Sequence, residues 1–444
     1  MTELPSKLYF APGDYFMLIQ DGWMRRSGME GNICCAVLQL DRGLDVERLR
    51  RRMKESPFMD WLARVRAVRP LPFLPPVWRT VREPGQILFE HTGKGSEMET
   101  PWSAPKVVTQ HRLRPDCEPG VAFDVLHHAD GTSHLFFSWN HTLLDASGVD
   151  FILHHLSVNG ESKNAPALKD FINPKQIKGL PISQWWSNMG FAKTSWKWLE
   201  ESGKEPLFTP APPDPRAVDL KNHQRRIRFT AEETASIAAR CGKIAGGFRR
   251  SHFYLAASVQ ALHNIARQRG NKDGAYLIPA PHDMRRHGAK GPIFSNHLSV
   301  LFYRIEASQA GQIRETVAEL GKQMTNQIRE KFPEACMAAL NMFKILTPGA
   351  YVKQLGKPTK DKLASLSFSD SGEACPGMTE FCGAKILDVT HLIPCWRSPG
   401  VTILFLQFAN RLSFLLSWVD DSLTPAEADA LERDLRRTLL ESDL

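Results

Sequence analysis

The chain has 444 residues, of which 42% are hydrophobic and 23% are charged, a balance that is ordinary for a folded globular protein. One hydrophobic core rarely supports so long a chain, so we expect two domains. The formal charge of +8 favours anionic partners. No zinc-finger spacing and no aromatic RNA-binding motif accompanies that charge, and we therefore predict no nucleic-acid partner.

The eight cysteines form no CxxC pair, which argues against a zinc ribbon and fits a reducing compartment. The N-terminus lacks an apolar signal segment, and no apolar run approaches the roughly 18 residues that span a bilayer. We therefore expect a cytoplasmic protein. Glycine-rich nucleotide motifs, HExxH and GxSxG are also missing from the sequence, so we predict no nucleotide cofactor, no metal site and no serine hydrolase of that type.

In the first part of the chain, the pattern predicts strands with helices and loops between them. Residues 1–30 are expected to be irregular, and residues 33–40 to form a buried strand. A helix capped by Asp45 should follow to about residue 55. Residues 61–68 alternate as a strand does, which would place Arg64 and Arg66 on one face. Residues 121–126 and 134–139 read as a hairpin.

A tryptophan-rich stretch from 184 to 200 predicts a helix. Trp185, Met189, Ala192, Trp196 and Leu199 recur at helical spacing. Such a stripe usually packs on a core. The alternative is a helix that covers an acyl-chain pocket or lies on a membrane surface, which would make the protein peripheral to the membrane.

Five prolines between residues 202 and 220 enforce an extended path, which is typical of a linker. We therefore divide the chain into an N-terminal half at 1–201, a linker at 202–220 and a C-terminal half at 221–444. Strands are expected at 226–229, 275–279, 300–305, 363–369, 401–408 and 412–418. Helices are expected after the capping boxes at Thr230 and Thr424, at 251–267 and along a stripe from 313 to 328. Strands and helices do not alternate strictly, so the class is α+β.

The candidate site lies in residues 134–148, which read HLFFSWNHTLLDASG. The segment begins as a strand, breaks into a polar turn and continues into a helix. His141 follows the strand end, and Asp145 is four residues later, close enough to fix the turn. His141 is therefore a candidate general base. The chain holds 15 histidines, so chance supplies such a spacing at about even odds, and a solvated turn histidine is the alternative.

Residues 140–146, NHTLLDA, resemble the HHxxxDG motif. That motif belongs to the superfamily of non-ribosomal peptide condensation domains, wax ester synthase/diacylglycerol acyltransferases and related CoA-dependent acyltransferases. Three further segments resemble other stretches of that superfamily, in the same order along the chain. They are the arginine-bearing segment at 64–66, the stretch from 277 to 296 and the turn at 367–372.

The resemblance implies an α+β fold of two chloramphenicol-acetyltransferase-like halves, arranged as a V-shaped pseudo-dimer around a central channel. It implies an acyltransferase of lipid or secondary metabolite biosynthesis, with acyl-CoA or an acyl-carrier protein as co-substrate. The acceptor would be a hydroxyl or amine of a small molecule or a lipid. No permanently bound cofactor is expected.

By this resemblance, His141 matches the catalytic histidine. Asp145 matches a structural aspartate that pairs with an arginine, and Arg64 or Arg66 is the expected partner. Gly148 is assigned to the same structural motif. Candidates for channel or substrate-binding residues are Trp139, Asn140, Ser147, Arg285 and Asn296.

Three residues depart from the superfamily pattern. Asn140 replaces the first histidine, Ala146 replaces the glycine after Asp145, and Asp370 stands where asparagine is preferred. If position 146 required a positive φ, alanine there would be strained. Asn140 and Ala146 support an alternative function, a catalytically inactive, condensation-like binding or scaffold protein.

Overall fold

The computed structural model describes most of the chain. The described ranges are 4–71, 74–93, 96–157, 171–178, 182–212, 214, 218–247, 249–271, 273–285, 289, 291–360, 362 and 364–441, without the side chains of 182–187. Strands and helices are mixed along the described chain, which confirms the expected α+β class.

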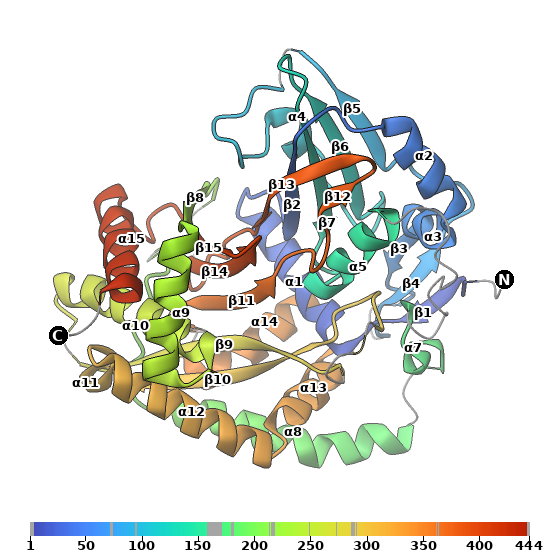
Figure 1. The fold of residues 1–444 in the computed structure, drawn as a ribbon. Helices are drawn as coiled ribbons and strands as arrows, with labels where there is room; N and C mark the ends of the chain where they lie inside the picture. The colour runs from blue at the N-terminus through green and yellow to red at the C-terminus, as the bar shows by residue number, and fades with distance from the viewer. Residues whose placement is uncertain are drawn as a thin grey trace.

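The largest sheet has six strands in the order β12–β13–β2–β7–β6–β5 (Figure 1). Their bounds are Glu380–Phe381, Ala384–Leu392, Ile33–Leu40, Ser133–Asn140, Val121–His127 and Leu88–His91. All neighbours are antiparallel except β5 and β6. The strand at 33–40 and the hairpin of β6 and β7 are confirmed. Two strands of this sheet, β12 and β13, come from beyond residue 380, so the chain crosses back to complete the sheet.

The other three sheets are smaller. One has the order β11–β14–β15–β8, with bounds Ser367–Glu373, Val401–Phe408, Arg411–Val419 and Asn222–Arg228. A long two-stranded ribbon pairs β9 (Ala275–Asp283) with β10 (Leu298–Glu306). The third has the order β1–β4–β3, with bounds Lys7–Tyr9, Val77–Thr80 and Val65–Val68. The division of the chain at 202–220 stays a prediction.

The helices cover these sheets. Up to residue 202 they are α1 (Pro12–Arg26), α2 (Val46–Glu55), α3 (Pro57–Arg64), α4 (Lys106–Thr109), α5 (Ala146–Ser157), α7 (Pro174–Lys178) and α8 (Ile182–Ser202). Beyond it they are α9 (Ala231–Ala245), α10 (Arg250–Gln268), α11 (Ala307–Ala310), α12 (Ile313–Arg329), α13 (Phe332–Phe343), α14 (Pro348–Gly356) and α15 (Pro425–Leu440). A short 3-10 helix covers Lys357–Thr359.

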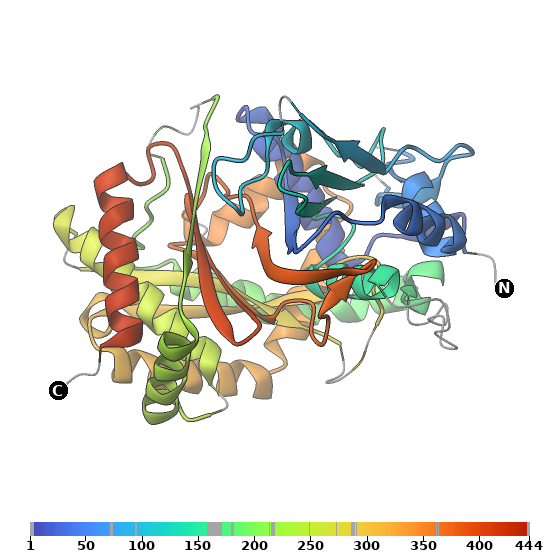
Figure 2. The ribbon, with the colours of Figure 1, turned by 45° about the horizontal axis from the view of Figure 1, so that its top comes forward.

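Two large clusters of buried apolar side chains form the cores. The first joins α1, α2, α3 and α5 to the six-stranded sheet, and it also takes in Phe294, Tyr351 and Phe381 from the second part of the chain. The second lies between residues 227 and 439, where α9, α10 and α15 pack with the four-stranded sheet. Figure 2 shows α15, in red, and α2, in blue, at opposite sides of the molecule. The V-shaped arrangement of two halves stays a prediction.

Two expectations about the first 70 residues were wrong. Residues 1–30 were expected to be irregular, but they contain β1 and α1. Pro12 begins α1, and the carboxylate of Asp14 accepts the N–H of Ala11 at 2.8 Å. Residues 61–64 were expected to extend a strand, but they end α3. Ser56 caps that helix and Pro57 opens it, and these start signals prevail over the alternating pattern.

The tryptophan-rich helix is confirmed as α8, and its described part packs on protein. The ring of Trp196 meets Phe343 of α13 edge to face, and that of Trp198 meets Phe332. The side chain of Trp185 lies outside the described residues, so membrane contact through 184–200 stays a prediction. Within the described ranges, no helix combines the length and the apolar composition needed to cross a membrane.

Candidate active site

The candidate site forms where residues 140–148 meet Arg285 and residues 291–297. The turn after β7 carries His141, and its main-chain N–H donates to the carbonyl oxygen of Asn32 at 2.8 Å. Leu144 makes isolated bridges with Phe294 and Ser295, and the N–H of Ser295 donates to the carbonyl oxygen of Leu143 at 2.7 Å. Two segments about 150 residues apart are therefore held together by main-chain hydrogen bonds beside His141.

Asn296 fixes the imidazole of His141. The Asn296 Nδ2 donates to the carbonyl oxygens of His141 and Thr142, at 2.8 and 3.1 Å. These two acceptors settle the orientation of the amide, so its Oδ1 is the atom 3.0 Å from His141 Nδ1. A carbonyl oxygen only accepts, so Nδ1 carries the proton. The neutral ring then keeps its lone pair on Nε2, which is the form a general base requires.

Burial also favours the neutral ring. It lowers the pKa of His141 below its ordinary value of 6.5, because the charged ring would lose hydration. The contact with its own main chain, the charge of Asp145 and the bond to Asn296 oppose this shift in part. His141 is consequently neutral at neutral pH.

Asp145 pairs with Arg285, which corrects the expected pairing with Arg64 or Arg66. The Nη2 of Arg285 lies 3.0 and 2.9 Å from the two carboxylate oxygens, and both side chains are almost fully buried. Arg64 instead pairs with Asp60, one helical turn earlier in α3. Arg66 is buried and donates to the carbonyl oxygens of Ala63 and Val65.

The same aspartate begins α5. Its Oδ1 accepts the N–H of Gly148 at 3.1 Å, as an N-cap residue does, and its Oδ2 accepts the N–H of His297 at 3.1 Å. Ala146 is the first residue of α5, and it is not among the residues with positive φ. Alanine at 146 is therefore unstrained, and Asp145 ties the turn to α5, to Arg285 and to His297.

Asn140 is buried and has a structural role in place of the superfamily's first histidine. Its Nδ2 donates to Asp21 Oδ1 at 2.8 Å, and its Oδ1 accepts the N–H of Thr142 at 3.0 Å. Asp21 also accepts the N–H of Asn32. Asn140 thus holds the turn against α1.

Sequence reasoning missed two buried acids of α1. Asp21 supports Asn140, and Asp14 Oδ1 accepts the main-chain N–H of Asn296 at 2.9 Å. The available signals were Pro12 at the helix start and the Asp21–Arg25 pair four residues apart. Burial raises the pKa of Asp14 to about 6, against several hydrogen bonds that lower it.

The other two candidates lie around the same turn. Trp139 is buried, and within the described ranges its indole Nε1 has no hydrogen-bond partner. Ser147 is exposed on the first turn of α5.

A cavity of about 920 Å³ lies beside α1. It is lined by Asp21 and Gly22 of α1, by residues 67–69, by residues 109–112 and by residues 114–116. Five of its lining residues are the arginines Arg25, Arg26, Arg69, Arg112 and Arg114. Asp21 on the cavity wall accepts a hydrogen bond from Asn140, the residue that precedes His141 in the chain.

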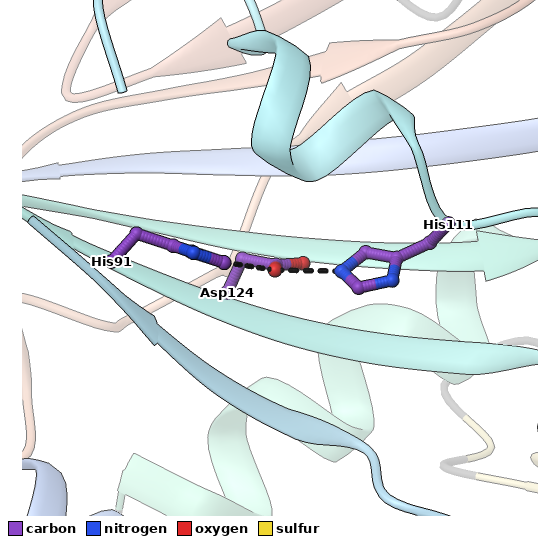
Figure 3. Close-up of side chains that lie close together, drawn as sticks. All are labelled: His91, His111 and Asp124. Carbon is purple, nitrogen blue, oxygen red and sulfur yellow. Dashed lines mark hydrogen bonds and ion pairs between the residues drawn. The ribbon is translucent and has the colours of Figure 1, made fainter. Parts of the chain in front are cut away.

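Away from this site, the fold gathers a second group of side chains. His91, His111 and Asp124 offer nitrogen and oxygen atoms that all lie within 4.8 Å of one another (Figure 3). The sequence predicts no metal site, because these residues are too far apart in the chain for a motif to show them.

Solved structures with the same fold exist, although no family model and no curated protein sequence matches the chain. The trichothecene 15-O-acetyltransferase from Fusarium sporotrichioides has a TM-score of 0.70 at 12% identity, over 98% of this chain and 95% of that one. The first condensation domain of the CDA synthetase has a TM-score of 0.67 at 11% identity, over 98% and 95%. The epimerization domain from the third module of tyrocidine synthetase B has 0.66 at 13%, over 99% and 98%.

The chain therefore has the fold of the condensation-domain superfamily, as its resemblance to the HHxxxDG pattern implies. Identities of 10–13% establish the fold and not the activity, so the chemistry has to be argued from the residues of this chain.

Proposed function

We propose that the protein is an acyltransferase that moves an acyl group from a thioester to a hydroxyl or an amine, with His141 as the general base. The observation that supports this most is the hydrogen bond between His141 Nδ1 and Asn296 Oδ1, because it leaves the lone pair on Nε2. The solvated turn histidine considered above would not need such a bond.

In the proposed reaction, Nε2 takes the proton of the acceptor as its oxygen or nitrogen attacks the thioester carbonyl carbon. The carbonyl π electrons move to the oxygen, which becomes the oxyanion of a tetrahedral intermediate. When that intermediate collapses, the carbonyl re-forms and the carbon–sulfur bond breaks. The imidazolium then returns its proton to the leaving thiolate, which restores the neutral ring. General-base assistance of this kind contributes about 10² to 10⁴ in rate.

Two nearby donors are already engaged and are not available to the oxyanion. The N–H of Gly148 donates to Asp145, and the Asn296 amide donates to two carbonyl oxygens. Asp145 and Arg285 are positioning residues in this proposal, because their ion pair holds the turn that carries the base.

The arginine-lined cavity favours a donor with an anionic portion. Arg26 and Arg112 lie on its wall, together with Asp21, which accepts a hydrogen bond from Asn140. A CoA thioester and a carrier-protein thioester both bring phosphate groups, which arginine binds well. The assay below identifies the acceptor, which is a small molecule or a lipid.

The test measures thiol release from acyl-CoA and from acyl-carrier protein in the presence of a panel of alcohols and amines. We expect acceptor-dependent release by the wild type and by His154→Ala, because His154 is exposed on α5. His141→Ala should release thiol only at the background rate. Binding of the donors without release by the wild type would favour the alternative, an inactive binding or scaffold protein, and would contradict the acyltransferase proposal.

A further inference from the structure

Two histidines from separate elements converge on one carboxylate oxygen of Asp124 in the first part of the chain. His91 ends β5, Asp124 lies in the neighbouring strand β6, and His111 comes from the loop after α4 (Figure 3). The Nε2 atoms of His91 and His111 lie 2.6 and 2.8 Å from Asp124 Oδ1. His91 and His111 are 33 and 13 residues away from Asp124 in the chain, so the fold alone brings them together.

The other oxygen of Asp124 makes this arrangement unusual for a simple hydrogen-bond network. Asp124 is fully buried, and its Oδ2 has no hydrogen-bond partner within the described ranges. Both histidines thus approach one oxygen while the second buried oxygen is left without a donor. A buried carboxylate in that state is costly unless a cation, a proton or a water satisfies it.

Packing orients the ring of His111 toward the carboxylate. It lies tilted against Phe89, with ring centroids 4.3 Å apart, and Phe89 is opposite Asp124 in the β5–β6 register. His91 and His111 are each 15% exposed at the side chain, so water and ions have access to the group. His111 also lines the 920 Å³ cavity, which supplies a route from solvent.

We propose that His91, His111 and Asp124 bind a divalent transition-metal ion, with Zn²⁺ as the probe of choice. Two imidazole nitrogens and one carboxylate oxygen are ligands that zinc accepts, and they leave one position of a tetrahedral ion for water. Ligand atoms around zinc lie about 3.3 Å apart in a tetrahedron, so the two nitrogen–oxygen distances must widen by about 0.5 to 0.7 Å. The two imidazole nitrogens, which lie within 4.8 Å of each other, must also reach a separation of about 3.3 Å, so both rings have to move around Asp124 Oδ1 when the ion binds.

The ion would join the loop after α4 to the six-stranded sheet, because one ligand comes from the loop and two come from strands. That loop also forms part of the wall of the arginine-lined cavity. The role is therefore structural, at a distance from His141, and the proposal holds whether or not the protein transfers acyl groups. Its readouts are metal content and thermal stability.

The experiment strips the full-length protein of metal with a chelator, removes the chelator and titrates Zn²⁺. Bound zinc is then measured by mass spectrometry after gel filtration, and Tm is measured with and without zinc. We expect one zinc per chain and a rise in Tm of at least about 2 °C at saturating zinc. No stoichiometric zinc in the wild type would overturn the proposal.

The variants are His111→Gln and Asp124→Asn, with His127→Gln as the matched control. His127 lies at the end of β6 and has a single carboxylate partner, Glu90, at 3.1 Å. We expect affinity to fall at least about 100-fold in His111→Gln, with the Tm of its metal-free form close to that of the metal-free wild type. Asp124→Asn should also lose the metal, and His127→Gln should keep it.

Undiminished binding by His111→Gln would contradict the proposal. Co²⁺ provides a second readout, because ligation by nitrogen and oxygen gives visible bands without a thiolate charge-transfer band. A thiolate band would assign the ion to a cysteine, such as the exposed Cys117, and would equally overturn the proposed ligands.

Discussion

Asn296 and Arg285 control the candidate site at the scale of single residues. Both come from the segment that approaches the His141 turn from the second part of the chain. Asn296 sets the tautomer of the base, and Arg285 neutralises the buried aspartate that caps α5. Neither touches the reacting atoms in the proposed reaction, so both act through His141.

Asn296→Ala removes the partner of His141 Nδ1. The base is then less well oriented, and we expect kcat to fall about 10- to 100-fold with a smaller change in KM. Because the bond to Asn296 raises the pKa of His141, its loss should also move the acid limb of the pH–rate profile to lower pH. The measurement is kcat/KM from pH 5 to 8. An unchanged kcat with an unchanged acid limb would show that Asn296 does not position the base.

Arg285→Ala leaves the Asp145 carboxylate buried without its cation. Removing one partner of a buried pair costs about 3–5 kcal/mol of the free energy of unfolding. Arg64→Ala serves as the control, since its partner Asp60 is about half exposed and such pairs contribute about 0–1 kcal/mol. Urea unfolding measures both. A larger effect of Arg64→Ala than of Arg285→Ala would contradict the assigned pairing.

The motif around His141 could be predicted from the sequence because its residues are close together in the chain. The partner of Asp145 could not, since 140 residues separate Arg285 from it. Arg64 and Arg66 were reasonable candidates only while both were assigned to a strand. The Ser56–Pro57 helix start places Arg64 at the end of α3, where Asp60 is its nearest acid.

At the scale of elements, the first turn of α5 depends on the glycine at 148 and not on position 146. A Cβ added to Gly148 would lie 2.7 Å from the carbonyl oxygen of Ile293, which belongs to the approaching segment. Main chain cannot rotate away as a side chain does, so the two segments would have to separate. Ala146 is unaffected, because it has an ordinary helical position.

We therefore expect Gly148→Ala to lower the free energy of unfolding by about 1–3 kcal/mol. Ala146→Gly restores the superfamily residue but should change stability by at most about 1 kcal/mol, and it should not increase activity. Urea unfolding and the thiol-release assay test the pair. A gain of activity in Ala146→Gly, with Gly148→Ala tolerated, would reverse this assignment.

Strong local signals predicted most of the other elements. Thr230 and Thr424 both cap helices through the expected capping boxes, and the strand at 401–408 matches β14. The strands β12 and β13 were not predicted, and neither was their place in the first sheet, which depends on packing between distant parts of the chain.

At the scale of the whole molecule, buried histidines make stability depend on pH. Burial lowers the pKa of His134, His252 and His391 to about 4, so the unfolded chain binds more protons at these positions between about pH 6.5 and 4. Asp14 and Asp150 have the opposite effect on stability. Burial raises the pKa of each to about 6, so at these positions the folded chain binds more protons than the unfolded chain below that pH. Three histidines against two carboxylates leave a net loss of stability on acidification.

We predict that the free energy of unfolding is highest above pH 6.5 and falls toward pH 4. One uncompensated histidine corresponds to a slope of about 1.4 kcal/mol per pH unit. Denaturant unfolding at several pH values measures it, and His391→Gln should reduce the slope. Stability that stays constant or rises from pH 6.5 to 4 would contradict the buried, neutral state of these histidines.

The proposed function depends on His141 acting as a base in acyl transfer. The most direct measurement is the ratio of kcat/KM of the wild type to that of His141→Ala, with one thioester donor and one acceptor, at pH 7.5. We predict a ratio of about 10² to 10⁴, and a ratio near 1 for His154→Ala. Equal kcat/KM for the wild type and His141→Ala, with both proteins folded, would contradict the proposed mechanism.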